Sequence, residues 1–311
     1  MGRVAPTLGL VDTVSKTIVV AINPAAAFGA KGGVGPAVVA ALRARGHEVT
    51  SLSEASFPLL LEVTTAALAD PPDALVVVGG DGMVGFGVNL TAQTGIPLGI
   101  VPSGTGNDMA RGLDIPVDDT EAAIARLVAA LELPPRTIDA GLITCPDGSI
   151  RWFACVLSGG FDAKVNERAN RMRRPRGASR YILALLRELV TLAPIRYALE
   201  LDDVRSSQDA ILVAVGNNVS FGGGMRVAPE ALLDDGLFDV VTLDPVNRRQ
   251  LLRIFPSVFS GTHIRDPRVR VRRAAHVRIA ADGVIAYADG ERVGELPLDL
   301  RVVPGALTIL A

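Results

Sequence analysis

The sequence predicts a two-domain protein: an α/β domain built on a parallel sheet with flanking helices, followed by an all-β, sandwich-like domain with a helical insertion. Three observations predict this fold class. The chain has 311 residues, about the length of two domains, and 49% of them are hydrophobic. In its first third, short β-branched runs alternate with longer segments rich in alanine and leucine, which is typical of a parallel sheet covered by helices. Beyond residue 134, short apolar runs are separated by Gly, Asp, Pro and Asn, which is typical of antiparallel sheets.

The α/β domain is expected over residues 1–133. Its strands are predicted at residues 17–22, 48–52, 75–78 and 98–101, and its helices at residues 38–45, 57–69, 84–91 and 120–131. The last helix ends before Pro134 and Pro135, which cannot continue it, so the domain boundary is placed there.

The β domain is expected over residues 134–311. Its strands are predicted at residues 137–143, 151–157, 211–215, 238–243, 269–272 and 277–280, and one helix at residues 181–191 interrupts them. Short strands separated by turn residues predict an antiparallel sandwich or barrel.

Composition excludes several classes of protein. The 31 Lys and Arg nearly balance the 33 Asp and Glu, so no field of the whole chain favours nucleic acid. Two cysteines and three histidines are too few for a disulfide framework or a zinc cluster, and a reducing cytoplasm is the expected compartment. The N-terminus lacks the continuous apolar core of a secretory signal, and the apolar stretch at residues 181–192 is too short to span a bilayer. Any membrane contact is therefore expected to be peripheral.

Three glycine-rich loops follow the predicted strands of the first domain, at residues 23–35, 79–83 and 102–108. Ligands of such sheets bind outside the carboxyl ends of the strands, and glycine lets backbone N–H groups approach an anion. Neither the P-loop pattern nor the dinucleotide pattern G-x-G-x-x-G is complete here. The loops therefore predict a phosphate site of another kind.

Two of these loops carry a carboxylate directly after an apolar strand, Asp81 and Asp108. Gly-Asp-Gly is by itself a common turn signal, so a simple turn is the alternative. A carboxylate in the ligand crevice can instead hold Mg²⁺, which takes oxygen ligands and bridges to substrate phosphates.

These loops resemble the paired nucleotide-binding motifs of the diacylglycerol kinase and sphingosine kinase catalytic-domain family. The resemblance rests on Gly79-Gly80-Asp81-Gly82 and on Pro102-Ser103-Gly104-Thr105-Gly106-Asn107-Asp108. Further motifs follow in that family's order: Asn23-Pro24, Ser53, Asp139, the segment from Pro229 to Leu237, and Asp289-Gly290-Glu291. The sequence departs from the family at Met83, where many members have Thr, and at Ala26, Ala27 and Phe28. The resemblance spans residues 17–310 and implies the fold shared by NAD kinases and diacylglycerol kinases.

The resemblance implies a lipid kinase that uses ATP and Mg²⁺ and transfers the γ-phosphoryl group to a lipid hydroxyl, such as that of diacylglycerol. Positioning and charge neutralisation account for most of the catalysis in such a transfer. The residues implied to surround the nucleotide are Asn23, Pro24, Ser53, Gly79, Gly80, Asp81, Gly82, Met83, Thr105, Asn107 and Asp108.

The resemblance also implies two places for Mg²⁺. The catalytic ion and its waters are expected to be organised by Asp81, Asp108 and Asp139. A second, structural ion is expected at Asp235 and the backbone carbonyls of Leu232 and Leu237. The alternative for that segment has no metal and is an acidic turn before the strand at residues 238–243.

The catalytic residues are expected to be Asp81 together with Asp289 and Glu291, because a carboxylate near the acceptor hydroxyl can take its proton. Asp-Gly between apolar flanks is also a hairpin signal. Both interpretations hold together if a tight turn presents the carboxylates to the cleft between the domains. The sequence leaves open which of Asp289 and Glu291 is the base.

A basic cluster at residues 168–180 precedes the predicted helix and suits an anionic lipid surface. The alternative is a solvated loop whose arginines pair with Glu167 and Glu188. We expect the cluster to face the bilayer and the protein to lie in the cytoplasm, associated peripherally with the inner face of the membrane, where its lipid substrate is. No nucleic-acid partner is expected, and exposed strand edges leave a homodimer open.

Two other functions are compatible with the same fold. An NAD kinase shares a Gly-Gly-Asp-Gly turn, but it is disfavoured by the motif at residues 102–108 and by Asp289-Gly290-Glu291. A non-catalytic regulator that binds lipid or nucleotide is disfavoured because Asp81, Asp108, Asp289 and Glu291 are all present. The acceptor lipid itself is not marked by any motif.

Overall fold

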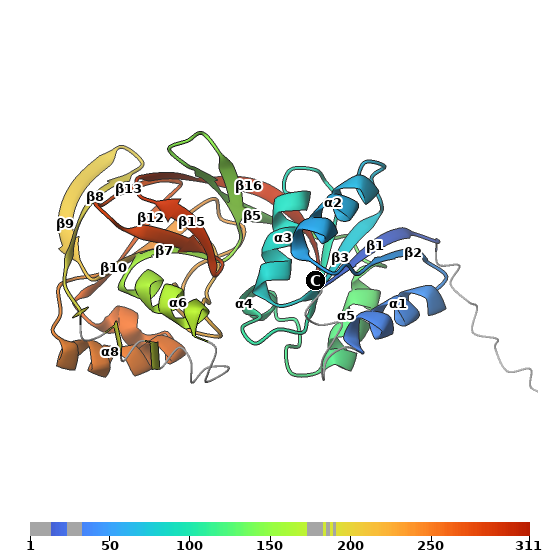
Figure 1. Ribbon diagram of the computed structural model, residues 1–311, viewed down its shortest axis with the longest axis horizontal. Helices are drawn as coiled ribbons and strands as arrows, with labels where there is room; N and C mark the ends of the chain where they lie inside the picture. Colours follow the sequence, from blue (N-terminus) through green and yellow to red (C-terminus); the bar gives the residue numbers. More distant parts are fainter. Residues whose placement is uncertain (1–13, 24–32, 173–182, 185–186, 189–190) are drawn as a thin grey trace, which may run out of the picture.

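The protein is described here from a computed structural model, which places residues 14–23, 33–172, 183–184, 187–188 and 191–311. Figure 1 shows two bodies side by side, a β-rich body at the left and an α/β body at the right. The predicted combination of an α/β domain and an antiparallel sandwich is confirmed.

A parallel sheet forms the centre of the α/β body. Its strands pair in the order β2-β1-β3-β4, and they are β1 (Thr17–Ile22), β2 (Glu48–Leu52), β3 (Ala74–Gly79) and β4 (Leu98–Pro102). Every residue of β3 and β4 is buried, as expected for strands covered on both faces. The four predicted strands are confirmed to within a residue at each end.

Helices follow each of these strands. They are α1 (Val34–Ala44), α2 (Phe57–Ala67), α3 (Asp81–Thr91), α4 (Asp108–Gly112) and α5 (Thr120–Ala130). Side chains cap two of them: Ser56 Oγ accepts the Leu59 N–H, and Asp119 Oδ1 accepts the Ala122 N–H. No described side chain caps α3, which begins directly after Gly80 and three residues earlier than predicted. This helix start therefore stays open at the edge of the sheet.

The β-rich body is a sandwich of two sheets. One sheet continues the parallel sheet with β5 (Arg136–Thr144), β6 (Ile150–Phe153), β8 (Ile195–Leu201), β9 (Val204–Ala210), β13 (His276–Ala280) and β16 (Leu298–Leu310). The other, in the order β12-β11-β10-β7-β14-β15, contains β7 (Val156–Gly160), β10 (Leu212–Gly216), β11 (Phe238–Leu243), β12 (Val269–Ala274), β14 (Ile285–Ala288) and β15 (Glu291–Glu295). Phe153 stacks on Phe238 between the sheets, with ring centroids 5.5 Å apart.

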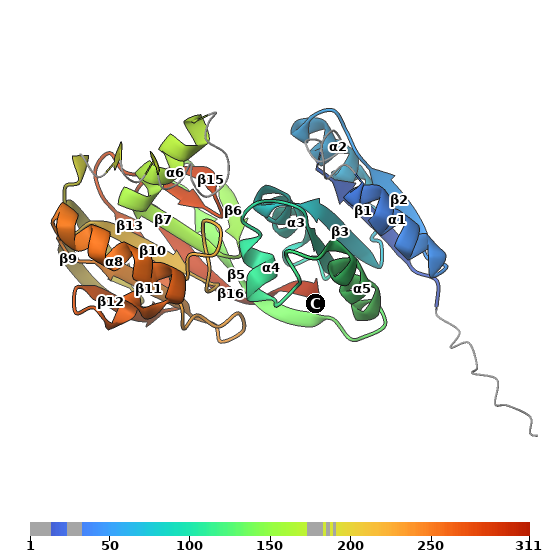
Figure 2. The same cartoon turned by 90° about the horizontal axis from the view of Figure 1, so that it is seen from below.

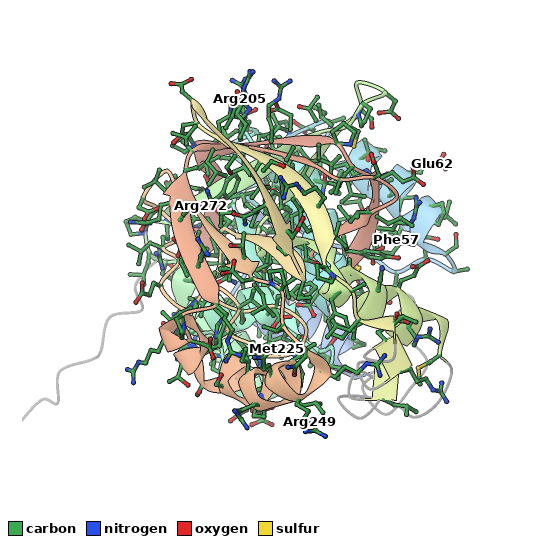
Figure 3. The ribbon with its side chains drawn as sticks, turned by 90° about the vertical axis from the view of Figure 1, so that its left-hand side faces the viewer. Phe57, Glu62, Arg205, Met225, Arg249 and Arg272 are labelled. Atoms are coloured by element: carbon green, nitrogen blue, oxygen red, sulfur yellow. The ribbon has the colours of Figure 1, made fainter. Side chains whose placement is uncertain are left out.

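Among the described residues, the helical segments that accompany the sandwich include α6 (Phe161–Arg171), α8 (Arg248–Ser260) and the 3₁₀ helix η2 (Thr262–Arg265). Figures 1 and 2 show α6 and α8 against the same sheet, and Figure 3 shows Met225 between α8 and the strands. These segments were not predicted, and the single strand predicted at residues 151–157 is wrong, because Ala154 and Cys155 separate β6 from β7. Most of the helix predicted at residues 181–191 lies outside the described residues.

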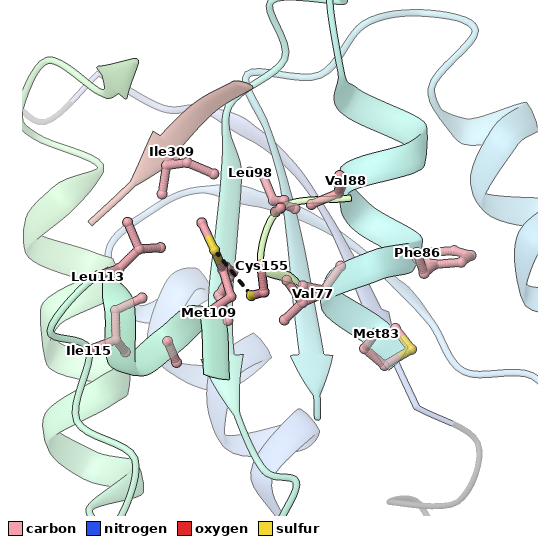
Figure 4. Packing of buried hydrophobic residues seen from close by; sticks show 14 of the residues in the cluster. Val77, Met83, Phe86, Val88, Leu98, Met109, Leu113, Ile115, Cys155 and Ile309 are labelled. Carbon is pink, nitrogen blue, oxygen red and sulfur yellow. Dashed lines mark hydrogen bonds between the residues drawn. The ribbon is translucent and has the colours of Figure 1, made fainter. Parts of the chain in front are cut away.

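Strand β16 joins the two bodies. Residues 298–301 pair with β13, while Ile309 and Leu310 pair in parallel with Leu98 and Gly99 of β4. Figure 4 shows Ile309 beside Leu98 in the apolar core. The sheet is thus continuous across residue 134, and the division of the chain at that point stays a prediction. Within the described residues, no helix is long and apolar enough to cross a bilayer.

Candidate active site

Asp81 links the two glycine-rich loops at the carboxyl end of the parallel sheet. Its Oδ2 accepts the Asn107 N–H at 3.0 Å and its Oδ1 accepts the Asp108 N–H at 2.7 Å. Burial, followed by the charge of Asp108, raises the pKa of Asp81 from 3.8 to about 6. A cation beside these two carboxylates relieves both effects, so the residues fit Mg²⁺ held by one or two carboxylates and by substrate phosphates.

The two loops pack backbone against backbone, and this explains their glycines. A Cβ atom on Gly104 would lie 2.4 Å from the Cα of Gly80, and one on Gly106 would lie 2.2 Å from Oδ2 of Asp81. Asn107 has a φ of 56° and fixes its loop by bonding the N–H and carbonyl of Gly104 through its side-chain amide. Any side chain at Gly104 would separate the loops.

Ser103 leaves a buried hydroxyl next to these glycines. Its backbone N–H donates to the carbonyl of Gly79 at 2.8 Å, but its Oγ has no hydrogen-bond partner among the described residues. A buried hydroxyl without a partner is costly and is commonly found where a ligand supplies the missing bond. Ser103 belongs to the motif at residues 102–108 but was not among the residues predicted to surround the nucleotide.

Asp108 is held by a loop of the sandwich that was not predicted. Its carboxylate accepts the N–H groups of Gly223, at 3.0 and 3.2 Å, and of Gly224, at 2.9 Å. Glycines 222–224 all have positive φ, from 69° to 96°, a conformation that favours glycine. Three consecutive glycines were the sequence signal for this loop, but their partner lies more than a hundred residues earlier.

Asp289 and Gly290 form the turn between β14 and β15, so the predicted hairpin is confirmed. Both have positive φ, 49° and 86°, and Ala288 pairs with Glu291. The Asp289 carboxylate accepts three backbone N–H groups, from Ala154 at 2.8 Å, Cys155 at 2.9 Å and Val156 at 3.0 Å. Burial, with a smaller contribution from the charge of Asp81, raises the pKa of Asp289 to about 6.

The side chain of Glu291, the first residue of β15, reaches the start of α3. Its Oε1 would be 3.6 Å from a Cβ atom on Gly82, the residue that follows Asp81. The residue is exposed. The hairpin therefore brings Asp289 and Glu291 to the same sheet edge as Asp81 and Asp108, although the two pairs are far apart in the sequence.

Cys155 is buried between β6 and β7, close to the carboxylates of the site. Its Sγ is 3.9 Å from the Sδ of Met109, as Figure 4 shows, and 3.4 Å from the side-chain nitrogen of Asn218. Burial and the charges of Asp289 and Asp108 raise the pKa of its thiol well above the usual range. Cys155 is therefore a neutral packing residue, and Asn218 also donates to the carbonyl of Asp108 at 3.2 Å.

Asp139 lies apart from this group. Its carboxylate accepts the N–H groups of Gly236 at 2.7 Å and Gly305 at 2.9 Å, so it fastens a loop and the bend of β16. Among the described residues, no three carboxylate, imidazole or thiol groups are placed to hold one metal ion. The structure therefore does not join Asp139 to Asp81 and Asp108, and a role of Asp139 toward Mg²⁺ stays a prediction.

Asp235 has protein partners on both carboxylate oxygens. Oδ1 accepts the Leu237 N–H at 3.1 Å, and Oδ2 forms an ion pair with Arg273. Leu232, the other residue expected at this ion, has an exposed side chain. A second Mg²⁺ at this loop stays a prediction, and it requires that the Arg273 guanidinium leave the carboxylate.

We expect the Asp235→Ala variant to unfold about 2–4 °C below the wild type, because a partly exposed ion pair contributes up to about 1 kcal/mol. Activity should fall together with stability. Because the predicted second Mg²⁺ needs this carboxylate, adding Mg²⁺ should raise the melting temperature of the wild type more than that of the variant. Differential scanning fluorimetry with and without Mg²⁺ measures this, and an equal rise in both proteins would leave Arg273 as the partner of Asp235 in place of the ion.

The remaining predicted nucleotide residues lie around the same sheet edge or cannot be placed. Asn23 directly follows β1 and donates its N–H to the carbonyl of Val78 at 3.0 Å. Ser53 lines a hollow of about 480 Å³ with Arg43 and Ile22, between α1 and the first two strands. Thr105 is exposed, and Pro24 lies outside the described residues.

Met83 is placed differently from the other motif residues. Its side chain is 1% exposed and lies in the core, where Figure 4 shows it near Phe86. A Cβ atom on Gly79 would be only 2.4 Å from its Cγ. Met83 therefore packs against the end of β3 and presents no polar side-chain group to a ligand.

Comparison with known proteins gives consistent matches along the chain. Residues 17–141 match the diacylglycerol kinase catalytic domain, and residues 155–311 match the YegS C-terminal NAD kinase beta sandwich-like domain. A diacylglycerol kinase of Mycobacterium tuberculosis is 38% identical over 93% of both chains. A protein of Stenotrophomonas maltophilia described as a probable lipid kinase YegS-like is 29% identical over 75% of this chain and 77% of its own length.

Solved structures share the fold at low sequence identity. A diacylglycerol kinase of Bacillus anthracis aligns with a TM-score of 0.68 at 19% identity, covering 95% of this chain and 96% of its own. An NAD kinase of Archaeoglobus fulgidus solved with ATP aligns with a TM-score of 0.54 at 13% identity, covering 95% and 93%. These two likenesses show the fold alone.

Proposed function

The chain belongs to the family of diacylglycerol kinases and YegS-like lipid kinases, and from this we propose that it transfers the γ-phosphoryl group of ATP, bound with Mg²⁺, to the hydroxyl group of diacylglycerol or a related membrane lipid. The observation that carries the proposal is the convergence of Asp81, Asp108 and Asp289 at the open start of α3. Such a site suits phosphoryl transfer, which depends on positioning and on neutralising phosphate charge.

The nucleotide phosphates are proposed to lie against the packed glycine loops. Ser103 offers its unpartnered hydroxyl there, and the open start of α3 favours negative charge. Asp81 and Asp108 hold Mg²⁺, which neutralises the phosphates when it is bound. Glu291 reaches Gly82, the residue after Asp81, and so lies beside the proposed phosphate site.

Asp289 is proposed as the base that takes the proton of the lipid hydroxyl. A carboxylate has about four lone-pair positions, and three are filled by the N–H groups of residues 154–156. These three bonds fix the carboxylate rigidly and leave one position for the hydroxyl. Its pKa of about 6 is close to neutral pH, the range in which general bases work best.

The acyl chain of the lipid is proposed to enter an apolar cavity in the sandwich. The cavity measures about 110 Å³ and lies between α6, α8 and the sheet that contains β10, β11 and β12. Phe221 and Met225, which flank the glycine loop at Asp108, line it on the side of the site. An apolar cavity of this size stays dry and accepts small apolar groups, such as the end of an acyl chain. The substrate therefore brings the protein to the inner face of the membrane.

We expect a Val258→Phe variant, which fills this cavity from α8, to raise KM for a long-chain diacylglycerol on the order of tenfold, since each excluded methylene costs about 0.8 kcal/mol. KM for a short-chain diacylglycerol should not change. Steady-state kinetics on both lipids in detergent micelles measure the difference. Val258→Ala is the matched control and should behave as the wild type, while equal KM changes for both lipids would contradict the assignment of the cavity.

The proposed function is tested by transfer of radiolabelled phosphate from Mg²⁺-ATP to a panel of lipids in mixed micelles, with NAD as a further acceptor. We expect label in diacylglycerol or a related lipid. Label in NAD alone would make the protein an NAD kinase. ATP binding without label in any acceptor would indicate a regulator.

A further inference from the structure

The outer face of α8 is apolar and basic although it points to solvent. This face consists of Arg249, Leu252, Arg253, Pro256 and Phe259, all of them exposed. Leu252 and Phe259 are 44% and 49% exposed, and the spacing of residues 252, 256 and 259 places them in one stripe along the helix. Figure 3 shows Arg249 pointing away from the body of the protein.

The inner face of α8 already supplies the apolar stripe that a surface helix needs. Leu251 and Ile254 are buried, and together with Phe255 and Val258 they line the apolar cavity. A helix that only covers a core carries polar residues on its opposite face. The ring of Phe259 contacts that of Phe255 edge to face, with centroids 5.7 Å apart, but Leu252 and Phe259 keep a large exposed apolar surface, which indicates a second apolar environment.

The charge beside this stripe is positive and is carried by Arg249 and Arg253. α8 contains three arginines and no acidic residue. The carboxylates that flank it in sequence, Asp244 and Asp266, form ion pairs with Arg270 and Arg268, each at 2.7 Å. No ion pair between described residues involves Arg249 or Arg253. The chain as a whole has a net charge of −2, so this basic face is a local feature and complements an anionic surface.

We infer that the outer face of α8 is the surface by which the protein docks on an anionic lipid bilayer; in naming a membrane as the partner, the inference rests on the proposed function. Leu252 and Phe259 enter the boundary between headgroups and acyl chains, and Arg249 and Arg253 meet the lipid phosphates. The same helix then carries the acyl-chain cavity on its inner face. Docking thus places the cavity directly behind the bilayer surface.

The experiment is sedimentation of the purified full chain with phosphatidylcholine vesicles, with and without phosphatidylglycerol, at increasing salt. The variant is Arg249→Glu with Arg253→Glu, and a second variant is Leu252→Ser with Phe259→Ser. The matched control is Arg196→Glu with Arg205→Glu, which changes the net charge equally on β8 and β9, where Figure 3 shows Arg205 far from Arg249.

We expect the wild type and the control to bind vesicles that contain phosphatidylglycerol, and both α8 variants to bind at least tenfold more weakly. Phosphorylation of short-chain diacylglycerol in detergent micelles should be unchanged in the α8 variants. Equal binding of wild type and α8 variants, equal loss in the control, or no binding of the wild type would overturn the inference. Binding that depends on α8 in a protein without lipid kinase activity would support the docking surface and refute the proposed function instead.

Discussion

Replacing Asp81 by Asn is expected to lower kcat for lipid phosphorylation on the order of 10³-fold, because it removes a carboxylate that would hold the Mg²⁺ that neutralises transition-state charge. Asn keeps one oxygen to accept an N–H from the loop after β4, so the packing of that loop should largely survive. Radiolabel transfer from Mg²⁺-ATP to diacylglycerol at saturating lipid measures the effect.

The same variant should change how Mg²⁺-ATP binding depends on pH. The folded pKa of Asp81 is raised to about 6, so a proton competes with the cation below that pH. In the wild type we expect the affinity to fall about tenfold for each pH unit below 6, because one proton must leave Asp81. Calorimetric titration of wild type and Asp81→Asn over this range separates this effect from the titration of the nucleotide, which both proteins share.

Asp81 makes folding stability change with pH in the direction opposite to that of an ordinary ion-paired aspartate. Between pH 3.8 and about 6 the folded protein holds a proton on Asp81 that the unfolded chain has released. Stability contributed by this group therefore falls as pH rises through that interval. In the Asp81→Asn variant, stability should fall less over this pH interval. A kcat equal to that of the wild type in this variant would show that Asp81 is not part of the catalytic site.

The second large effect is expected at Asp289. Asp289→Asn should lower kcat on the order of 10³-fold, since general-base catalysis contributes about 10²–10⁴-fold. Its melting temperature should stay near that of the wild type. Asn loses one of three N–H bonds but removes a buried charge, and each effect is about 1–3 kcal/mol in opposite directions.

Glu291→Gln provides the comparison for Asp289→Asn. Glu291 is exposed and reaches only the start of α3, so this variant should keep its melting temperature and lose at most about tenfold in kcat. In the wild type, kcat should decline below about pH 6 as Asp289 is protonated. If Glu291→Gln loses far more activity than Asp289→Asn, the base is Glu291.

Local sequence signals account for most of the α/β body and for some strands of the sandwich. Strands β1, β2 and β11 were predicted to the residue because β-branched runs there are bounded by polar or turn residues. Helix α8 was missed although it is amphipathic and begins with a capping box of Asn247 and Gln250, because Pro256 stands inside it and is usually a helix breaker. Strand β16 was missed because Pro304 and Gly305 interrupt it.

The candidate site could be predicted where a motif is local and not where its partners are distant. Asp81 and Asp108 each follow their own strand, and parallel strands end at one edge, so their meeting could be expected. The donors to Asp108 and Asp289 come from other parts of the chain, the glycine loop at residues 222–224 and the backbone of residues 154–156. Every residue except proline has a backbone N–H, so the sequence does not mark which of them will donate to a carboxylate, and only the fold reveals it.

The course of β16 bears on how the protein folds. β4 cannot complete its pairing until Ile309 and Leu310 arrive from the end of the chain, although its other partner, β3, comes from the first third. Such distant contacts make folding slow, and an α/β segment expressed without β16 would present an unpaired strand edge that favours aggregation. The two bodies should therefore melt in one cooperative transition, with neither serving as an independent folding unit.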